Sequence, residues 1–161
     1  MAILKLHKYG SPVLREKAMP VAKVDNEIRE LVENMIETMY AEGGVGLAAP
    51  QVGISKKIIV IDTEEEGTIV LINPVIIKRE GESKEEEGCL SVPGIYSPVR
   101  RSASITVEAL DLDENKNRIT QEGFLAIALQ HEIDHLEGYL FIDRLSPAKR
   151  LMIKDQLKEI E

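Results

Sequence analysis

The segment His131-Glu132-Ile133-Asp134-His135 carries the side chains best suited to metal chemistry. In a helix, residues four positions apart lie one above the other on the same face, so both imidazoles can bind one ion. Glu132 then lies beside a coordination position left open for water, where a carboxylate can act as general acid and base. The pattern predicts a catalytic metal site. Two histidines packed or solvated on a helix are the alternative.

A catalytic metal site usually has three protein ligands, so one more must come from elsewhere in the chain. The candidates are Cys89, the single cysteine, and His7, the one other histidine. Cys89 lies in a compact segment between Gly88 and Pro93, whereas His7 lies in an expected surface strand. A lone cysteine is more often a small buried apolar residue, but beside two histidines we favour it as a ligand. A nucleophilic Cys–His pair is an alternative that leaves the second histidine and Glu132 without a role.

The glycine-rich segment Gly44-Val45-Gly46-Leu47-Ala48-Ala49 formally fits a dinucleotide-binding fingerprint. That fingerprint follows a strand and opens a helix, whereas this segment follows an expected helix and leads into an expected strand. It is either a close-packed loop or a bare backbone along which a substrate can lie, with Gln51 offering an amide. The residues alone leave both interpretations open.

The elements that must position these residues follow from apolar periodicity. A helix is predicted from Asn26 to the Gly43-Gly44 pair, with Asp25 or Asn26 as its cap, and an apolar helix over 124–136 carries the two histidines. A terminal helix begins at Ser146-Pro147. Strands are predicted for 3–6, 57–62, 68–78, 102–111 and 118–120, the second and third of these forming an antiparallel pair, whereas 45–53 and the charged run 80–87 are predicted to be loops.

These elements predict an α+β fold. We expect antiparallel β-sheets packed around a central buried helix that carries the His-Glu-x-x-His motif, with a C-terminal helix. The 161 residues are expected to form a single domain over 1–161.

Composition and charge narrow the class of protein. A formal net charge of −8 argues against direct binding of nucleic acid, because a phosphate backbone is bound by clustered Lys and Arg. The chain has neither the apolar run of a signal peptide nor a stretch long enough to span a bilayer. A cytoplasmic location is therefore expected, where Cys89 would stay reduced.

Three segments, in this order and in a chain of this length, resemble bacterial-type peptide deformylase. They are Gly44-Val45-Gly46-Leu47-Ala48-Ala49-Pro50-Gln51, Glu87-Gly88-Cys89-Leu90-Ser91 and His131-Glu132-Ile133-Asp134-His135. The resemblance implies a metal-dependent hydrolase that removes the formyl group from the N-terminal formyl-methionine of newly synthesised proteins and releases formate. Its substrates would be N-formylmethionyl nascent polypeptides.

The resemblance also implies roles for individual residues. Cys89, His131 and His135 would hold the metal ion, and Glu132 would move the proton. The side-chain amide of Gln51 and the backbone N–H of Leu90 would stabilise the oxyanion, and Gly46 would contact the substrate backbone. The native ion would be Fe(II), with zinc, nickel or cobalt as alternative occupants, since ligand type alone does not choose between them.

Two further interpretations concern substrate and partner. An apolar pocket for the methionine side chain is expected, with Val45, Ile127 or Leu129 as candidate residues. The resemblance also suggests contact with the ribosome near the exit of nascent chains through the basic residues of the last helix, for which a solvated helix face is the ordinary interpretation. Those basic residues are Lys149, Arg150 and Lys154.

Two rival functions share parts of the motif. A metallopeptidase of the His-Glu-x-x-His kind would need a further His or Glu ligand downstream, and it would keep its metal after loss of Cys89. A metal-storing or structural module would need a fourth protein ligand, for which the sequence offers no convincing candidate.

Overall fold

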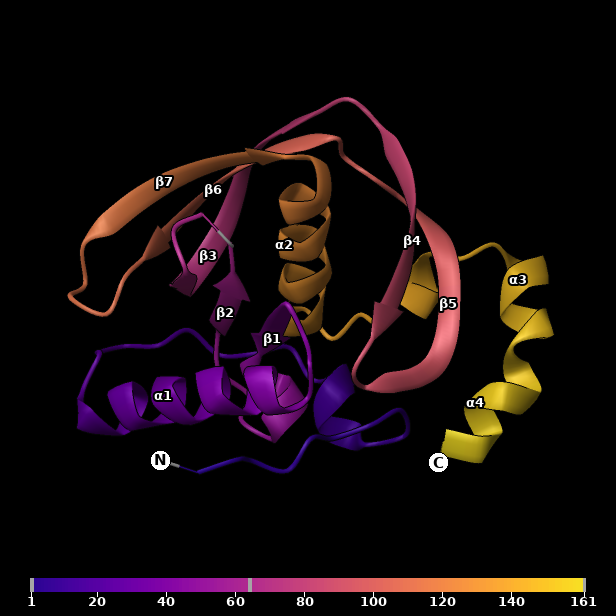
Figure 1. Cartoon of the computed structure of the whole chain (residues 1–161), viewed down its shortest axis with the longest axis horizontal. Coiled ribbons are helices and arrows are strands. Elements are labelled where there is room, and N and C mark those ends of the chain that lie inside the picture. Colours follow the sequence, from indigo (N-terminus) through magenta and orange to yellow (C-terminus); the bar gives the residue numbers. More distant parts are fainter. Residues whose placement is uncertain (1, 64, 161) are drawn as a thin grey trace.

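The computed structural model describes residues 2–63 and 65–160, and its elements surround one upright helix (Figure 1). In chain order they are η1 (Pro12–Arg15), α1 (Asn26–Ala41), β1 (Gly46–Ala48), η2 (Ala49–Val52), β2 (Ile58–Asp62), β3 (Thr68–Glu80), β4 (Ser83–Cys89), β5 (Val92–Arg101), β6 (Ser104–Leu110), β7 (Lys116–Glu122), α2 (Gly123–Leu136), η3 (Phe141–Arg144), α3 (Pro147–Met152) and α4 (Lys154–Ile160). The predicted α+β fold with antiparallel sheets is confirmed.

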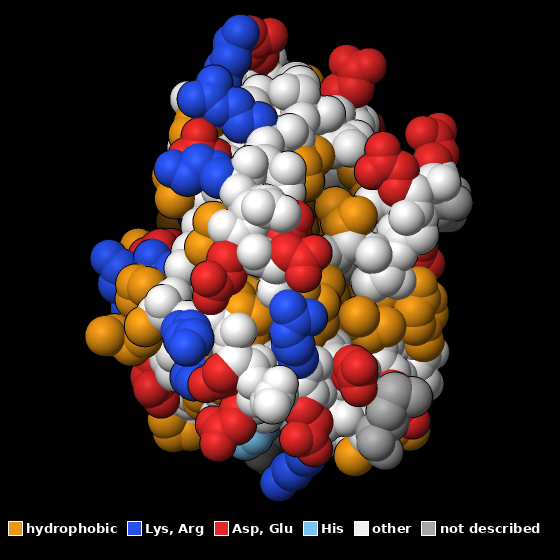
Figure 2. Space-filling view, turned by 90° about the vertical axis from the view of Figure 1, so that its left-hand side faces the viewer, with side chains coloured by type: hydrophobic (Ala, Val, Ile, Leu, Met, Phe, Trp, Pro, Cys, Tyr) orange, Lys and Arg blue, Asp and Glu red, His pale blue; other side chains and the backbone are white. Residues whose placement is uncertain are grey.

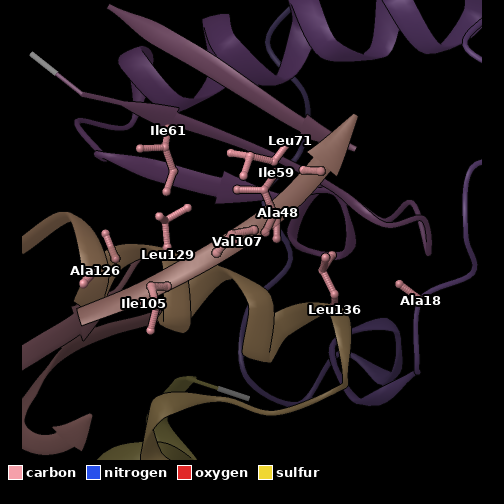
Figure 3. Packing of buried hydrophobic residues seen from close by; sticks show 12 residues of the cluster. Ala18, Ala48, Ile59, Ile61, Leu71, Ile105, Val107, Ala126, Leu129 and Leu136 are labelled. Atoms are coloured by element: carbon pink, nitrogen blue, oxygen red, sulfur yellow. The ribbon is translucent and has the colours of Figure 1, made fainter. Parts of the chain in front are cut away.

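The larger sheet has the strand order β1-β2-β3-β6-β7, and helices α2 and α1 cover opposite faces of its β1–β2 end. Successive side chains of a strand point to opposite faces, and the continuous apolar run of β2 uses both of them. Ile59 and Ile61 pack with α2 in one hydrophobic cluster, whereas Ile58 and Val60 pack with α1 in another. Figure 3 shows Leu129 of α2 pointing toward Ile61. Helix α2 is therefore fixed against the sheet by apolar burial.

Helix α1 confirms the first predicted helix. The side chain of Asp25 accepts a hydrogen bond from the backbone N–H of Ile28, as an N-cap residue should. The helix ends at Ala41, and Gly43 then adopts a positive φ of 71°. Such a backbone favours glycine and terminates the helix as expected.

The prediction that 80–87 forms a loop is wrong. Strand β4 occupies most of this run and pairs with β5 in a separate two-stranded sheet. Glu85 and Glu86 are exposed, whereas Glu87 is buried. The backbone pairing with β5 supports the strand although its side chains are charged, because strand preference depends more on neighbours than on the residues themselves.

The predicted loop 45–53 also contains regular structure, namely β1 and η2. The predicted strand 3–6 is wrong, since the structure assigns no strand to these residues. Two backbone bonds dock the segment that follows, from His7 N–H to Gln51 O at 2.7 Å and from Tyr9 N–H to Ser91 O at 2.8 Å. The start of the chain is thus bonded both to η2 and to the turn between β4 and β5.

The C-terminal helix is present as two short helices, α3 and α4, with a break at Ile153. Ser146 caps the first of them by accepting from the N–H of Lys149, as its position before Pro147 predicted. Ile153 and Leu157 pack against the hydrophobic cluster that includes residues of β5 and η3. These two side chains attach the C-terminal segment to the rest of the fold.

The surface in Figure 2 carries acidic and basic side chains mixed together, with apolar side chains between them. This face does not gather the positive charge that a phosphate backbone requires. Among the described helices, none is both long enough and apolar enough to cross a membrane.

Candidate metal centre

The structure brings Cys89, His131 and His135 together. The Nε2 atom of His135 lies 3.4 Å from Sγ of Cys89 and 3.3 Å from Nε2 of His131, and the three donor atoms all lie within 4.8 Å of one another. Among the described residues, this is the one group of three or more His, Cys, Asp or Glu side chains arranged to hold a metal ion. The predicted ligand set is thus spatially coherent.

These distances fit tetrahedral coordination. Two ligand nitrogens at 2.0–2.1 Å from an ion would stand about 3.3–3.4 Å apart, and a nitrogen and a thiolate sulfur about 3.5–3.6 Å apart. The observed separations of 3.3 Å and 3.4 Å are close to both values. Two imidazoles and one thiolate also match the three-ligand sites that keep one position for water or substrate. The residues present therefore fit a divalent ion.

Two elements supply the candidate ligands. Helix α2 places His131 and His135 one turn apart on a single face, with their ring centroids 5.0 Å apart. Cys89 is the last residue of β4, and Leu90 and Ser91 form the tight turn to β5. Figure 1 shows α2 standing between the larger sheet and the β4–β5 hairpin, so the two elements meet at the site.

Glu132 is buried beside the ligands. Its Oε1 atom has no hydrogen-bond partner among the described residues. Burial raises the pKa of Glu132 to about 7, against the opposing effect of His131 and with the support of Glu87. A Cβ at Gly46 would lie 2.9 Å from Oε2 of Glu132, so only glycine lets β1 approach this carboxylate.

The two histidines have different electrostatic surroundings. Burial lowers the pKa of His131, but Cys89 and the Glu87 carboxylate outweigh burial and leave that pKa well above its ordinary value. Burial and the neighbouring His131 hold the pKa of His135 well below its ordinary value. The carboxylate of Glu87 lies 2.9 Å from Nδ1 of His131, whereas Nδ1 of His135 has no partner among the described residues.

Gln51 is buried with its amide held in one orientation. Its Oε1 accepts a hydrogen bond from the backbone N–H of Ala48 at 3.0 Å, and its Nε2 donates to Oγ of Ser91 at 3.1 Å. The same Nε2 lies 3.7 Å from Sγ of Cys89. The amide N–H group therefore faces the ligands, where it can reach a developing negative charge.

A cavity of about 700 Å³ opens onto this centre. It is lined by four stretches that are far apart in the sequence, and its lining residues include Val45, Gly46, Gln51, Cys89, Leu90, Ile127, His131 and Glu132. His135 lies deeper and is 1% exposed. Of the expected methionine-pocket residues, Val45 and Ile127 line the cavity, whereas Leu129 is part of the hydrophobic core under the sheet.

The glycine segment is closely packed and also lines the cavity. Gly46 is required by close packing on Glu132, and it also lines the cavity with bare backbone. At Gly44, a Cβ would lie 2.8 Å from Cδ1 of Leu90, so this glycine lets the segment approach the turn after Cys89. Close packing and an accessible backbone are properties of the same strand.

Sequence reasoning missed four polar residues that contact the centre directly or through one another. Glu87 bonds His131, Ser91 accepts from Gln51, and Arg101 bridges Glu87 and Asp134. Asp134 lies three residues after His131, so helical spacing could have indicated that the two share a face. Glu87 lies in a run of glutamates that looked solvated, and nothing in the sequence alone distinguished it.

Comparison with known proteins identifies the family. Residues 3–151 match the family model described as polypeptide deformylase. The chain belongs to the peptide deformylase family. A peptide deformylase of Halothermothrix orenii is 56% identical over 146 residues, which cover 90% of this chain and 95% of that protein.

Solved structures agree with this family. The peptide deformylase of Legionella pneumophila superposes with a TM-score of 0.93 at 46% identity, over 98% of this chain and 94% of that one. The peptide deformylase of Ehrlichia chaffeensis in complex with actinonin superposes with a TM-score of 0.94 at 40% identity, over 100% of this chain and 99% of that one. The chain is a metal-dependent hydrolase of protein biosynthesis that acts on formylmethionyl peptides.

Proposed function

We propose that this deformylase uses Cys89, His131 and His135 to hold one divalent ion and Glu132, Gln51 and Leu90 to cleave the formyl amide bond. The observation that carries the proposal is that Cys89, His131 and His135 converge beside a cavity that Glu132, Gln51 and Leu90 also line. A divalent ion held there supplies Lewis acidity and lowers the pKa of water toward ~7.

Glu132 is the proposed general base and acid. In the metal-free site burial raises its pKa to about 7, and a carboxyl group near this range can accept a proton and return one at neutral pH. The unpartnered Oε1 leaves one oxygen available for that transfer. In the proposed reaction Glu132 takes the proton of the attacking water and delivers it to the amine that departs from the formyl carbon.

Gln51 and Leu90 are the proposed oxyanion donors. The amide of Gln51 is already oriented by Ala48 and Ser91, so little reorganisation energy is needed as negative charge develops. Leu90 follows Cys89 in the hairpin turn, which keeps its backbone beside the ligands. One donor comes from η2 and the other from the turn between β4 and β5, so the oxygen would be approached by two separate segments.

The substrate is proposed to lie along β1. This strand is an edge of the five-stranded sheet, and Gly46 brings its backbone to the cavity. Val45 and Ile127 would contact the methionine side chain, because both line the cavity with apolar surface. The same cavity would accept actinonin, since the Ehrlichia chaffeensis relative that superposes over the whole chain was solved with that compound.

Three finer points stay predictions. We propose Fe(II) as the native ion, with zinc, nickel or cobalt able to occupy the same ligands. We propose that the chain acts as a single domain in the cytoplasm. The exposed residues Lys149, Arg150 and Lys154 are candidates for contact with the ribosome, and no direct nucleic-acid site is proposed.

The proposal is tested by purifying the protein without oxygen, counting its metal and assaying formate release from formyl-Met-Ala-Ser. Acetyl-Met-Ala-Ser is the control, and mass spectrometry of the products reports any internal cleavage. Stoichiometric metal with formate release from the formyl peptide alone supports the proposal. Internal cleavage without formate would overturn it in favour of a metallopeptidase.

A further inference from the structure

Four charged side chains of alternating sign lead from His131 toward the surface. Glu87 lies 2.9 Å from Nδ1 of His131 and accepts two bonds from Arg101, at 2.8 Å and 2.9 Å. Arg101 also donates to Asp134 at 2.5 Å. Asp134 in turn accepts from Arg144 at 2.8 Å and 3.2 Å. These residues come from β4, β5, α2 and η3, so the chain of charges joins four elements.

Fold stability alone explains this arrangement poorly. The side chains of Arg101 and Glu87 are 4% and 5% exposed, so both ions have lost nearly all their water. Removing two charges from water costs about as much as their mutual attraction returns, and buried ion pairs are therefore weak contributors to stability. Such pairs can instead set the orientation of the groups that they bind.

The group oriented here is the ring of His131. A carboxylate only accepts hydrogen bonds, so Nδ1 of His131 must carry the proton that Glu87 receives. When the ring carries this one proton, as a metal-bound imidazole does, its lone pair is on Nε2, the nitrogen 3.3 Å from Nε2 of His135. By contrast, Nδ1 of His135 is buried without a partner among the described residues. Of the two histidines, His131 is the one oriented by charge.

Helix η3 supports the same ring from a second direction. The ring of Phe141 stacks on His131 with centroids 6.0 Å apart and an interplanar angle of 28°. Arg144, three residues later, binds Asp134 and lies over the ring of Tyr139, 5.1 Å from its centroid. One short helix therefore contacts both the imidazole and the outer end of the charge chain.

We propose that Arg101 and Asp134 are positioning residues for metal binding, which act by holding Glu87 against His131, with Arg144 as the outer support. This inference rests on the proposed metal site. Partners that orient a ligating histidine typically change metal affinity by about 10–100-fold when they are removed. Arg101 should have the larger effect, because it alone contacts both carboxylates.

The test compares the release of zinc(II) to a chelator from the folded protein with the melting temperature of the metal-free protein. Arg101→Lys keeps the buried positive charge, but an ammonium group lacks the planar fork that binds two oxygens of one carboxylate. Arg118→Lys is the matched control, since Arg118 pairs with Glu108 at 3.1 Å on the remote β6–β7 strands. Arg144→Met probes the outer end, which is 45% exposed and can be altered with less risk to folding.

We expect zinc release about 10–100-fold faster in Arg101→Lys and less than about 10-fold faster in Arg144→Met, with Arg118→Lys unchanged. Binding to the folded state raises the melting temperature, so the zinc-induced rise should also shrink in the first two variants. A lower metal-free melting temperature with unchanged zinc release would overturn the inference and leave Arg101 a purely structural role. If the unaltered protein does not retain zinc, the proposed metal site itself is wrong.

Discussion

The helix α2 and the β4–β5 hairpin contribute to the same centre in different ways. In α2, two proposed ligands and Glu132 lie within five consecutive residues, so their relative positions follow from the helix alone. In the hairpin, Cys89 and Leu90 reach the centre only because β4 pairs with β5 in one register and turns at residues 90–91. The relative positions of the helix residues depend on local geometry, whereas those of the hairpin residues depend on tertiary structure.

The largest effect is expected from Cys89→Ala, which tests whether the hairpin is as necessary as the helix. Removal of the thiolate leaves two protein ligands, so the metal should be lost and formate release should fall to the background rate. His135→Ala should give the same result from the helix side. Metal analysis and the formate assay measure both variants. Retention of metal in Cys89→Ala would show that the hairpin contributes no ligand.

Glu132→Gln separates chemistry from metal binding on the helix. The amide has nearly the same shape but cannot take a proton, so turnover should fall by about 10²–10⁴-fold. The metal content should remain at the level of the unaltered protein, because Glu132 is not one of the three proposed ligands. A variant that keeps both metal and turnover would remove Glu132 from the mechanism.

Gln51→Ala probes η2, the segment whose Gln51 contacts Ser91 in the hairpin turn. Loss of one oxyanion donor typically lowers turnover by about 10²–10³-fold. If the amide acts only in the transition state, kcat and kcat/KM should fall together. Ser91→Ala is the comparison, since it removes a partner of Nε2 but keeps the donor, and it should cost less. Equal losses in the two variants would indicate a structural role for the amide.

The smallest expected effect concerns stability of the metal-free protein. Below about pH 4.5 the carboxyl of Glu132 is protonated whether the chain is folded or unfolded. Because its pKa is raised to about 7 by folding, the folded state binds more protons between these values, and the free energy of unfolding falls as pH rises. Above pH 7 the buried, ionised Glu132 lowers the free energy of unfolding by about 3 kcal/mol relative to its value at pH 4.5.

Glu132→Gln should therefore be more stable than the unaltered metal-free protein at pH 8 and nearly equal to it at pH 4.5. Urea denaturation at both pH values measures the difference. Glu33→Gln, on the exposed face of α1, should show no such dependence. Equal stability of Glu132→Gln and the unaltered protein at pH 8 would mean that the buried carboxyl does not have a raised pKa.

The elements with regular apolar spacing could be predicted from the sequence. Helices α1 and α2 and the β2–β3 pair follow from periodicities of 3.6 and 2, and the two histidines follow from a spacing of four. The hairpin strands could not be found in this way. Glu85, Glu86 and Glu87 form a run of like charge, although the last of them is buried against Arg101 and His131.

The site residues likewise include some that sequence spacing predicts and some that it does not. The choice of Cys89 depended on its being the single cysteine beside two histidines, and the roles of Gln51 and Leu90 depended on resemblance to a family. Sequence spacing predicted none of these three residues. The contact of Gln51 with Ser91, for example, joins residues of η2 and the hairpin turn. Such contacts are decided by tertiary packing, which a single sequence does not express.

The two backbone bonds made by His7 and Tyr9 have a consequence for the order of folding. These residues are synthesised early, yet their acceptors are Gln51 O and Ser91 O, which appear much later in the chain. Contacts between distant residues form slowly because the intervening chain must first be closed into a loop. During synthesis, the start of the chain therefore cannot make both of its bonds until residue 91 has been added and placed, although it is itself made first.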